Sequence, residues 1–212
     1  MIHSQLMNKL KSIIFDESHL DQNIMILSGK PITMKNDFIF SIASHISSSK
    51  SQIHYFDINS QLRPTYPLLN LKTEKENAIK IYRLYNIETT EKILDYLCYR
   101  SENNNAIIIL DSILLNGRKI NLRNLELDAI YLFSLLNKFC KKTNGKVIII
   151  IHTNLTVQAL SKLSFFEEIK DNINALISLL QHDNDRIILD VYKYPFSEIS
   201  TYRITTKQMS EY

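Results

Sequence analysis

The chain has 212 residues, of which 45% are hydrophobic and 22% charged, and its formal net charge is +3. This composition excludes an intrinsically disordered protein, and the length favours one domain with a substantial core. The charge permits contact with nucleic acid without requiring it. No apolar run is long enough to span a membrane and no secretory pattern is present, so we expect an intracellular protein without a membrane partner.

Residues 1–22 form the first predicted element, a short amphipathic helix or extension that either caps the core or docks a partner. A core domain is expected over residues 23–208, and residues 209–212 are a short tail. The two cysteines, Cys98 and Cys140, lack the spacing of a metal or redox site, so no metal centre is predicted.

The next predicted element, a strand at 25–27, leads into a turn opened by Gly29 and an amphipathic helix, which is the layout of a phosphate-binding loop. Compared with G-x-x-x-x-G-K-[ST], Gly29 and Lys35 are kept, whereas Met34 replaces the second glycine and Asn36 the hydroxyl residue. Methionine hinders the close approach of backbone to phosphate that glycine allows. The segment is therefore either a phosphate loop kept as a structural turn, or an ordinary strand, turn and helix with a chance lysine.

Strands and helices alternate through the rest of the chain. The runs 106–112 and 146–152 contain consecutive large aliphatic residues, which is typical of central parallel strands buried on both faces. The alternation predicts an α/β fold with three layers and a mostly parallel central sheet that ends in antiparallel C-terminal strands. The other strands are expected at 51–57, 79–85, 173–180, 186–194 and 201–205, with helices at 89–100 and 125–142 and an irregular or helical stretch at 156–171.

Asp111 emerges at the carboxyl end of strand 106–112, and open α/β sheets bind their ligands at that edge. Apolar residues followed by Asp also form the second nucleotide-binding motif, whose carboxylate holds Mg²⁺ through water. A strand-terminal Asp can equally accept hydrogen bonds as a turn or helix cap, so both interpretations stay open for this residue.

The segment YFDINSQLRPTY at 55–66 resembles, in register and without a gap, the Y-I-D-T-E-G-T-F-R-P-E-R segment of RecA/RadA-type recombinases and their paralogues. The other motifs follow in that family's order: the phosphate loop at 29–36, AIIILDS like the magnesium-binding strand, IIIHTN like the strand ending in Thr-Asn-Gln, and YPFSEISTYRIT like the closing hairpin. The resemblance covers residues 20–208. It implies a RecA-like three-layer ATPase core.

The resemblance also implies a nucleotide site, composed of Gly29, Lys35, Asn36, Asn59 and Asp111. Asn59 stands where the family has the glutamate that activates water, and an amide cannot act as that base. Leu155 stands where the family has the glutamine that senses the γ-phosphate. Because Met34 and Asn36 are altered as well, we expect a vestigial site, with no catalytic residue, no ATP hydrolysis and no required cofactor.

Weak binding of ATP and magnesium through Lys35 and Asp111 remains open at such a site. The structural alternative is that Lys35 is solvated at a helix start and that Asp111 caps an element or accepts hydrogen bonds.

In the family, the loops after strands 106–112 and 146–152 line the filament axis and touch DNA. The corresponding basic residues here, which the resemblance makes candidates for DNA binding, are Arg118, Lys119, Arg123, Lys162 and Lys170. Cationic side chains on loops suit phosphate contact without sequence preference, and solvated basic loops are the alternative. Phe165 and Phe166, which accompany the second set, are either core residues or platforms for stacking bases.

The chain resembles the small, non-catalytic recombinase paralogues of Shu-type complexes, because the turnover residues are replaced and the Phe-x-x-Ala linkage strand is absent from the N-terminal linker. This resemblance implies a DNA-binding accessory subunit in homologous recombination and DNA repair. Such a subunit pairs with a recombinase or another paralogue, as a heterodimer or larger heteromer, and assists filament assembly on single-stranded DNA, in the nucleus if the source is eukaryotic. The alternatives are a divergent ATPase and a RecA-like scaffold in an unrelated assembly.

Overall fold

The computed structural model describes residues 23–29, 52–57, 79–83, 92, 94–95, 105–111, 122–153, 156–162, 164–183, 186–193 and 199–205. These residues form one eight-stranded sheet of order β3-β2-β4-β5-β1-β6-β7-β8. The strands are β1 (Ile24–Gly29), β2 (Ile53–Asp57), β3 (Ile79–Arg83), β4 (Ile107–Asp111), β5 (Lys146–His152), β6 (Ala175–Asp183), β7 (Arg186–Lys193) and β8 (Ile199–Thr205).

The predicted mixture of parallel and antiparallel strands is confirmed. The strands from β3 across to β6 pair in parallel, while β6 with β7 and β7 with β8 pair antiparallel. All eight predicted strands are present with small shifts at their ends. β6 extends beyond its predicted end at 180 to Asp183, through the polar residues Gln181 and His182. Its backbone stays paired with β7 over this part, and the register shifts between Gln181 and Asp183.

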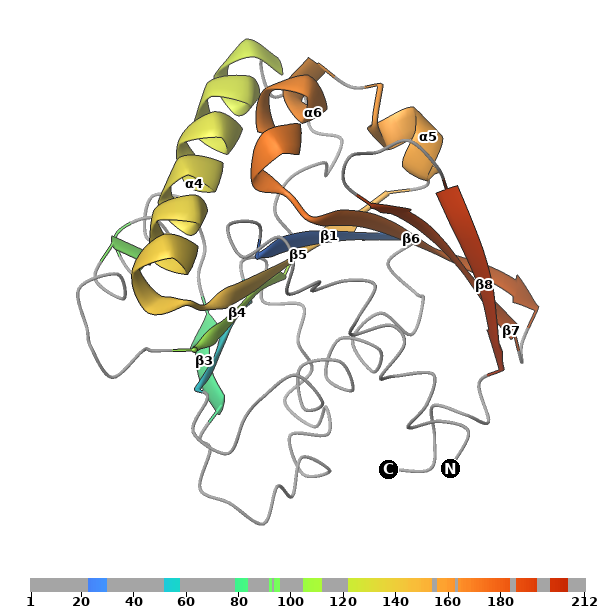
Figure 1. Cartoon of the computed structure of the whole chain (residues 1–212), viewed down its shortest axis with the longest axis horizontal. Helices are drawn as coiled ribbons and strands as arrows, with labels where there is room; N and C mark the ends of the chain where they lie inside the picture. The colour runs from blue at the N-terminus through green and yellow to red at the C-terminus, as the bar shows by residue number, and fades with distance from the viewer. Residues whose placement is uncertain are drawn as a thin grey trace.

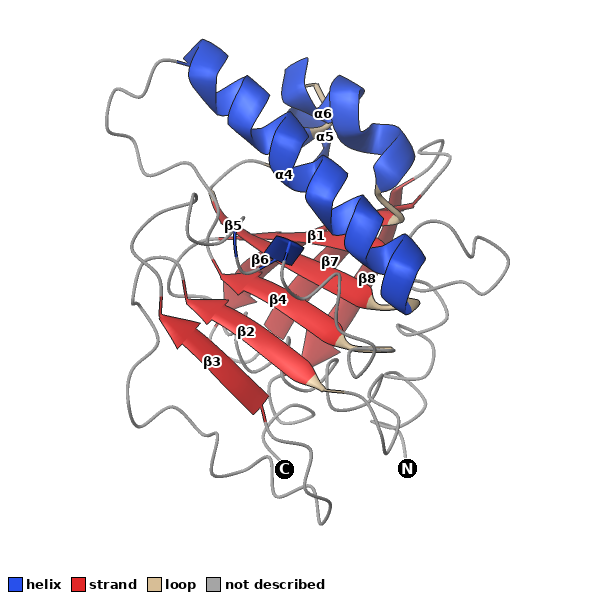
Figure 2. Ribbon diagram, turned by 90° about the vertical axis from the view of Figure 1, so that its left-hand side faces the viewer, coloured by secondary structure: helices blue, strands red, loops and turns tan. Residues whose placement is uncertain are grey.

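The described helices cover a single face of the sheet (Figures 1 and 2). The long helix α4 (Leu122–Thr143) contacts β1, β5 and α6 (Ser164–Ile169), while the short helix α5 (Val157–Leu160) contacts β6 and β7. A 3₁₀ turn, η3 (Lys170–Asn172), leads from α6 towards β6.

Several predicted segments fall outside the described residues. These segments are the N-terminal extension 1–22, the helix after the phosphate loop and the tail 209–212. Of the helix predicted at 89–100, Lys92, Leu94 and Asp95 are described and are helical. Asp95 forms an ion pair of 2.9 Å with Lys138 of α4, and Leu94 belongs to the same core cluster as α4, so this part of the chain packs beside that helix.

Both faces of the central strands are buried. Ile108 belongs to the core cluster that includes Leu136 and Phe139 of α4, whereas Ile109, its neighbour in β4, projects from the opposite face. Each of the two isoleucines is 0% exposed. The consecutive aliphatic residues of the sequence therefore reflect a strand that is covered on both sides, as expected for a parallel sheet.

The turn between α4 and β5 differs from expectation. The helix expected at 125–142 extends to Thr143, and the residue after it, Asn144, takes the left-handed conformation that glycine usually adopts at a helix end, with a φ of 50°. Gly145 is required for a different reason. A Cβ on it would lie 2.5 Å from Phe139 Cε1, 2.7 Å from Thr143 Oγ1 and 2.8 Å from the carbonyl oxygen of Ala106.

Among the described residues, no helix is both long enough and apolar enough to cross a lipid bilayer.

We predict that Ile108→Ala and Ile109→Ala each lower the free energy of unfolding by about 2–5 kcal/mol, because each removes a fully buried side chain from one face of β4. Ile130→Ala, on α4, is the matched control. Since Ile130 is 37% exposed, its loss should cost less than about 1 kcal/mol. Urea unfolding followed by circular dichroism measures all three, and a near-neutral result at either Ile108 or Ile109 would show that one face of the sheet is open.

We also predict that Gly145→Ala lowers the free energy of unfolding by about 1–3 kcal/mol, because the new methyl group overlaps Phe139 and the backbone of Ala106. Asn144→Gly is the control in the same turn. Glycine accepts a positive φ, so this change should stay within about 1 kcal/mol of the wild type. Equal effects of the two substitutions in thermal or urea unfolding would contradict the packing argument.

Candidate functional site

Parallel pairing brings the carboxyl ends of β1, β2, β4 and β5 to the same edge of the sheet. In the register of the sheet, Asp57 lies opposite Asp111 and Gly29 lies opposite His152. The backbone N–H of Thr153 donates to the Gly29 carbonyl at 3.0 Å, which joins the ends of β5 and β1. The strand that leads into the predicted phosphate loop therefore ends at the edge that carries Asp111.

Asp111 is buried, with 3% of its side chain exposed, and both of its carboxylate oxygens face side chains of the neighbouring strands. The hydroxyl of Tyr55, on β2, donates to Oδ2. On the other side, His152 of β5 places Nε2 3.4 Å from Oδ1. The carboxylate thus lies between a phenol and an imidazole, one from each adjacent strand.

The contact between His152 and Asp111 is at ion-pair distance, but its geometry is not that of a hydrogen bond. Asp111 Oδ1 and both ring nitrogens of His152 have no hydrogen-bond partner among the described residues. Only 10% of the His152 side chain is exposed, so water has little access to the ring. The 3.4 Å approach places a polar ring beside the buried carboxylate, which lowers the cost of burying it.

The resemblance to RecA/RadA-type recombinases implies a magnesium ion held near Asp111, and the described neighbours of that carboxylate fit the ion poorly. Mg²⁺ requires near-octahedral oxygen coordination and keeps several of its waters, which need space around the carboxylate. Here Oδ2 accepts from Tyr55 and Oδ1 faces the His152 ring. Within the described ranges, no three His, Cys, Asp or Glu side chains are grouped so that they could hold a metal ion.

The other predicted nucleotide-site positions lie outside the described residues. They are Lys35, Asn36 and Asn59, together with the altered positions Met34 and Leu155. The structure therefore places Gly29 and Asp111 at one edge of the sheet and gives no geometry for the remainder of the predicted site.

The candidate DNA-binding residues are separated in the fold. Arg123 lies in the first turn of α4, which begins at Leu122, and not in a loop as predicted. The sequence places the start at 125, whereas leucine and arginine at 122 and 123 are themselves good helix formers. Arg118 and Lys119 lie outside the described residues. Lys162 is exposed just after α5.

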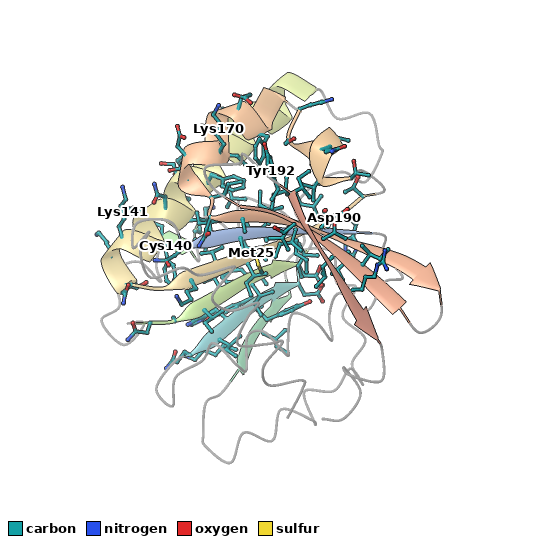
Figure 3. All side chains as sticks on the ribbon, turned by 45° about the vertical axis from the view of Figure 1, so that its right-hand side comes forward. Met25, Cys140, Lys141, Lys170, Asp190 and Tyr192 are labelled. Atoms are coloured by element: carbon teal, nitrogen blue, oxygen red, sulfur yellow. The ribbon has the colours of Figure 1, made fainter. Side chains whose placement is uncertain are left out.

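Lys170 occupies a different part of the molecule. It lies in η3, which precedes the amino end of β6, and it forms a 2.6 Å ion pair with Glu167. The hydrogen bond and the charge of Glu167 raise the pKa of Lys170 above its usual value. Figure 3 shows Lys170 on the helical layer above the sheet. Phe166, in α6, is 3% exposed and belongs to the core, so it is not a platform for stacking bases.

Tyr55 and His152 belong to the cluster around Asp111 although no sequence motif predicts a role for them. Tyr55 precedes Asp57 by two residues, so strand alternation places both on one face of the sheet. His152 ends an aliphatic strand, which is a weak signal alone. The signal becomes specific only when β2 and β5 are known to flank β4, and that order follows from the tertiary structure.

No family model matches this chain, and no curated protein matches its sequence. Among solved structures, the chain is similar to one described as an ATPase domain, with a TM-score of 0.59 and 9% sequence identity over 89% of this chain and 83% of that one. At this identity the similarity concerns the fold alone. Together with the mostly parallel sheet and its antiparallel C-terminal strands, it shows that the chain has a RecA-like fold.

Proposed function

We propose that the protein is a non-catalytic recombinase paralogue, a RecA-like pseudo-ATPase that acts as a DNA-binding accessory subunit in homologous recombination and DNA repair. In this role it assists recombinase filament assembly and works in a heteromer with a recombinase or another paralogue. It requires no nucleotide cofactor. Its place is inside the cell, and in the nucleus of a eukaryote.

One observation supports the non-catalytic part of this proposal above the others. At the carboxyl edge of a RecA-like sheet, Asp111 accepts from Tyr55 and faces His152 at 3.4 Å. A carboxylate engaged in this way is poorly suited to position a metal-bound water. The sequence supports the same conclusion independently, since Met34, Asn36, Asn59 and Leu155 stand where the family has its turnover residues.

The DNA-binding part is supported by the location of α4. This helix follows β4 and precedes β5 in the chain, and its first turn contains Arg123 and no acidic residue. The positive end of a helix dipole favours phosphate, and a nearby arginine can add a charge-assisted hydrogen bond. Arg118 and Lys119, in the segment just before α4, add two more positive charges. The formal net charge of +3 does not oppose binding to a polyanion.

A divergent ATPase is the second candidate function. Two observations favour it: the retained aspartate at the end of β4, and the similarity to a structure described as an ATPase domain. Lys35 would then bind phosphate, and hydrolysis would rely on residues other than those of the family.

We predict that the purified protein, alone and with single-stranded DNA, releases no phosphate from ATP in the presence of magnesium above the background of a Lys35→Ala variant. The reason is that an amide at 59 cannot serve as a general base. A malachite-green or coupled assay measures the release. Magnesium-dependent hydrolysis that Lys35→Ala abolishes would contradict the proposal and favour the divergent ATPase.

We predict that reversing three charges, with Arg118→Glu, Lys119→Glu and Arg123→Glu together, weakens binding to single-stranded DNA by at least about tenfold at low salt and reduces its salt dependence. Fluorescence anisotropy with a labelled oligonucleotide measures the affinity. We expect these three charges to be solvated, and solvated charges contribute little to stability, so the unfolding temperature should change little.

The matched control for this experiment carries the same number of reversals at exposed positions elsewhere, Lys80→Glu, Lys141→Glu and Arg203→Glu. It has the same net charge as the test variant and should bind DNA more tightly. Equal weakening by both variants would reduce the effect to net charge, and unchanged binding by the test variant would refute the assignment of this segment.

A further inference from the structure

The interactions of Asp111 connect three adjacent strands. Tyr55 comes from β2, Asp111 from β4 and His152 from β5, and β4 lies between the other two strands in the sheet. β4 and β5 are largely aliphatic, and β2 is buried along its whole length, so the effective dielectric constant is low and polar interactions are strong. A hydrogen bond and a close imidazole in such a place can stabilise the edge of the sheet.

A metal-binding carboxylate and a structural carboxylate have opposite effects on stability. A carboxylate that is kept for a ligand is incompletely satisfied without that ligand, so its replacement commonly leaves the protein equally or more stable. A buried carboxylate that accepts hydrogen bonds from protein groups does the reverse, because its replacement weakens those hydrogen bonds. Asp111 is of the second kind through the Tyr55 hydrogen bond to Oδ2, and the His152 ring lies 3.4 Å from Oδ1 without a hydrogen bond.

We propose that Asp111 is a structural carboxylate that joins β2, β4 and β5 at the carboxyl edge of the sheet, and that this site takes no divalent metal ion. The inference concerns the same edge as the proposed function and rests on it for the assignment of the site. It goes further, because it assigns a role to Tyr55 and His152 and states why the metal is lost. A water of Mg²⁺ could reach Oδ2 only by breaking the Tyr55 hydrogen bond, and Oδ1 only by displacing the His152 ring.

The first test measures metal binding directly, with Mn²⁺ as the probe and electron paramagnetic resonance as the readout. The wild-type protein should leave Mn²⁺ free at concentrations up to about a millimolar. A site on the wild-type protein that disappears in Asp111→Asn would overturn the inference. Such a site without ATP hydrolysis would overturn it while leaving the proposed non-catalytic function intact, so the two can fail separately.

The second test measures thermal unfolding without nucleotide or metal. Asp111→Asn keeps the shape of the side chain and removes its charge, and it should lower the unfolding temperature on the order of 5–10 °C. Asp190→Asn is the control, since Asp190 also accepts a hydrogen bond from a neighbouring strand, from Thr201 at 2.8 Å, but at a more exposed site. It should shift the temperature by less than about 2 °C. An unchanged or raised unfolding temperature in Asp111→Asn would overturn the inference.

Two further variants keep the test decisive if Asp111→Asn does not fold. Tyr55→Phe and His152→Gln each remove one contact of the carboxylate and leave Asp111 in place. Each should lower the unfolding temperature by a few degrees, and Tyr55→Phe should cost less when combined with Asp111→Asn than alone, because the two residues share one interaction. If neither single variant changes the unfolding temperature, Asp111 does not hold the strands together.

Discussion

The carboxyl edge of the sheet depends on the in-register parallel pairing of β4 with β2 on one side and β5 on the other. This register sets Asp57 opposite Asp111 and lets Tyr55 and His152 reach the same carboxylate from opposite sides. A slip of one residue in β5 would turn His152 to the other face of the sheet. The side chains on both faces of these strands are buried, so the polar cluster lies within an apolar core.

The burial of these strands also determines the strength of the polar interactions around Asp111. Asp111 lies at the end of a strand whose other residues are almost fully buried, and a carboxylate in such surroundings must be satisfied by the protein or by a ligand. In this protein a phenol donates to one carboxylate oxygen, and an imidazole lies 3.4 Å from the other. In the proposed structural role of Asp111, the stability of the sheet edge and the capacity to bind magnesium therefore oppose each other.

The basic residues show how the fold limits the proposed DNA contact. Arg123 lies at the start of α4 and Lys162 follows α5, after the carboxyl end of β5, whereas Lys170 is at the amino end of β6 and is paired with Glu167. Lys162 and Lys170 are close in the sequence, but they thus lie near opposite ends of the strands. A continuous DNA-binding path would use the first two and not Lys170, whose charge is already compensated locally.

The sequence by itself determined the α/β class, the eight strands and the position of Asp111 at a strand end, because continuous aliphatic runs and their flanking polar residues depend on local burial. It also indicated the end of α4 to within one residue, although Asn144 and not Gly145 adopts the left-handed conformation. Only the tertiary structure decided the partners of Asp111, since Tyr55 is 56 residues away and the contact exists only when β2, β4 and β5 lie side by side. Strand order depends on long-range packing, and for that reason the role of this carboxylate could not be settled from its local motif.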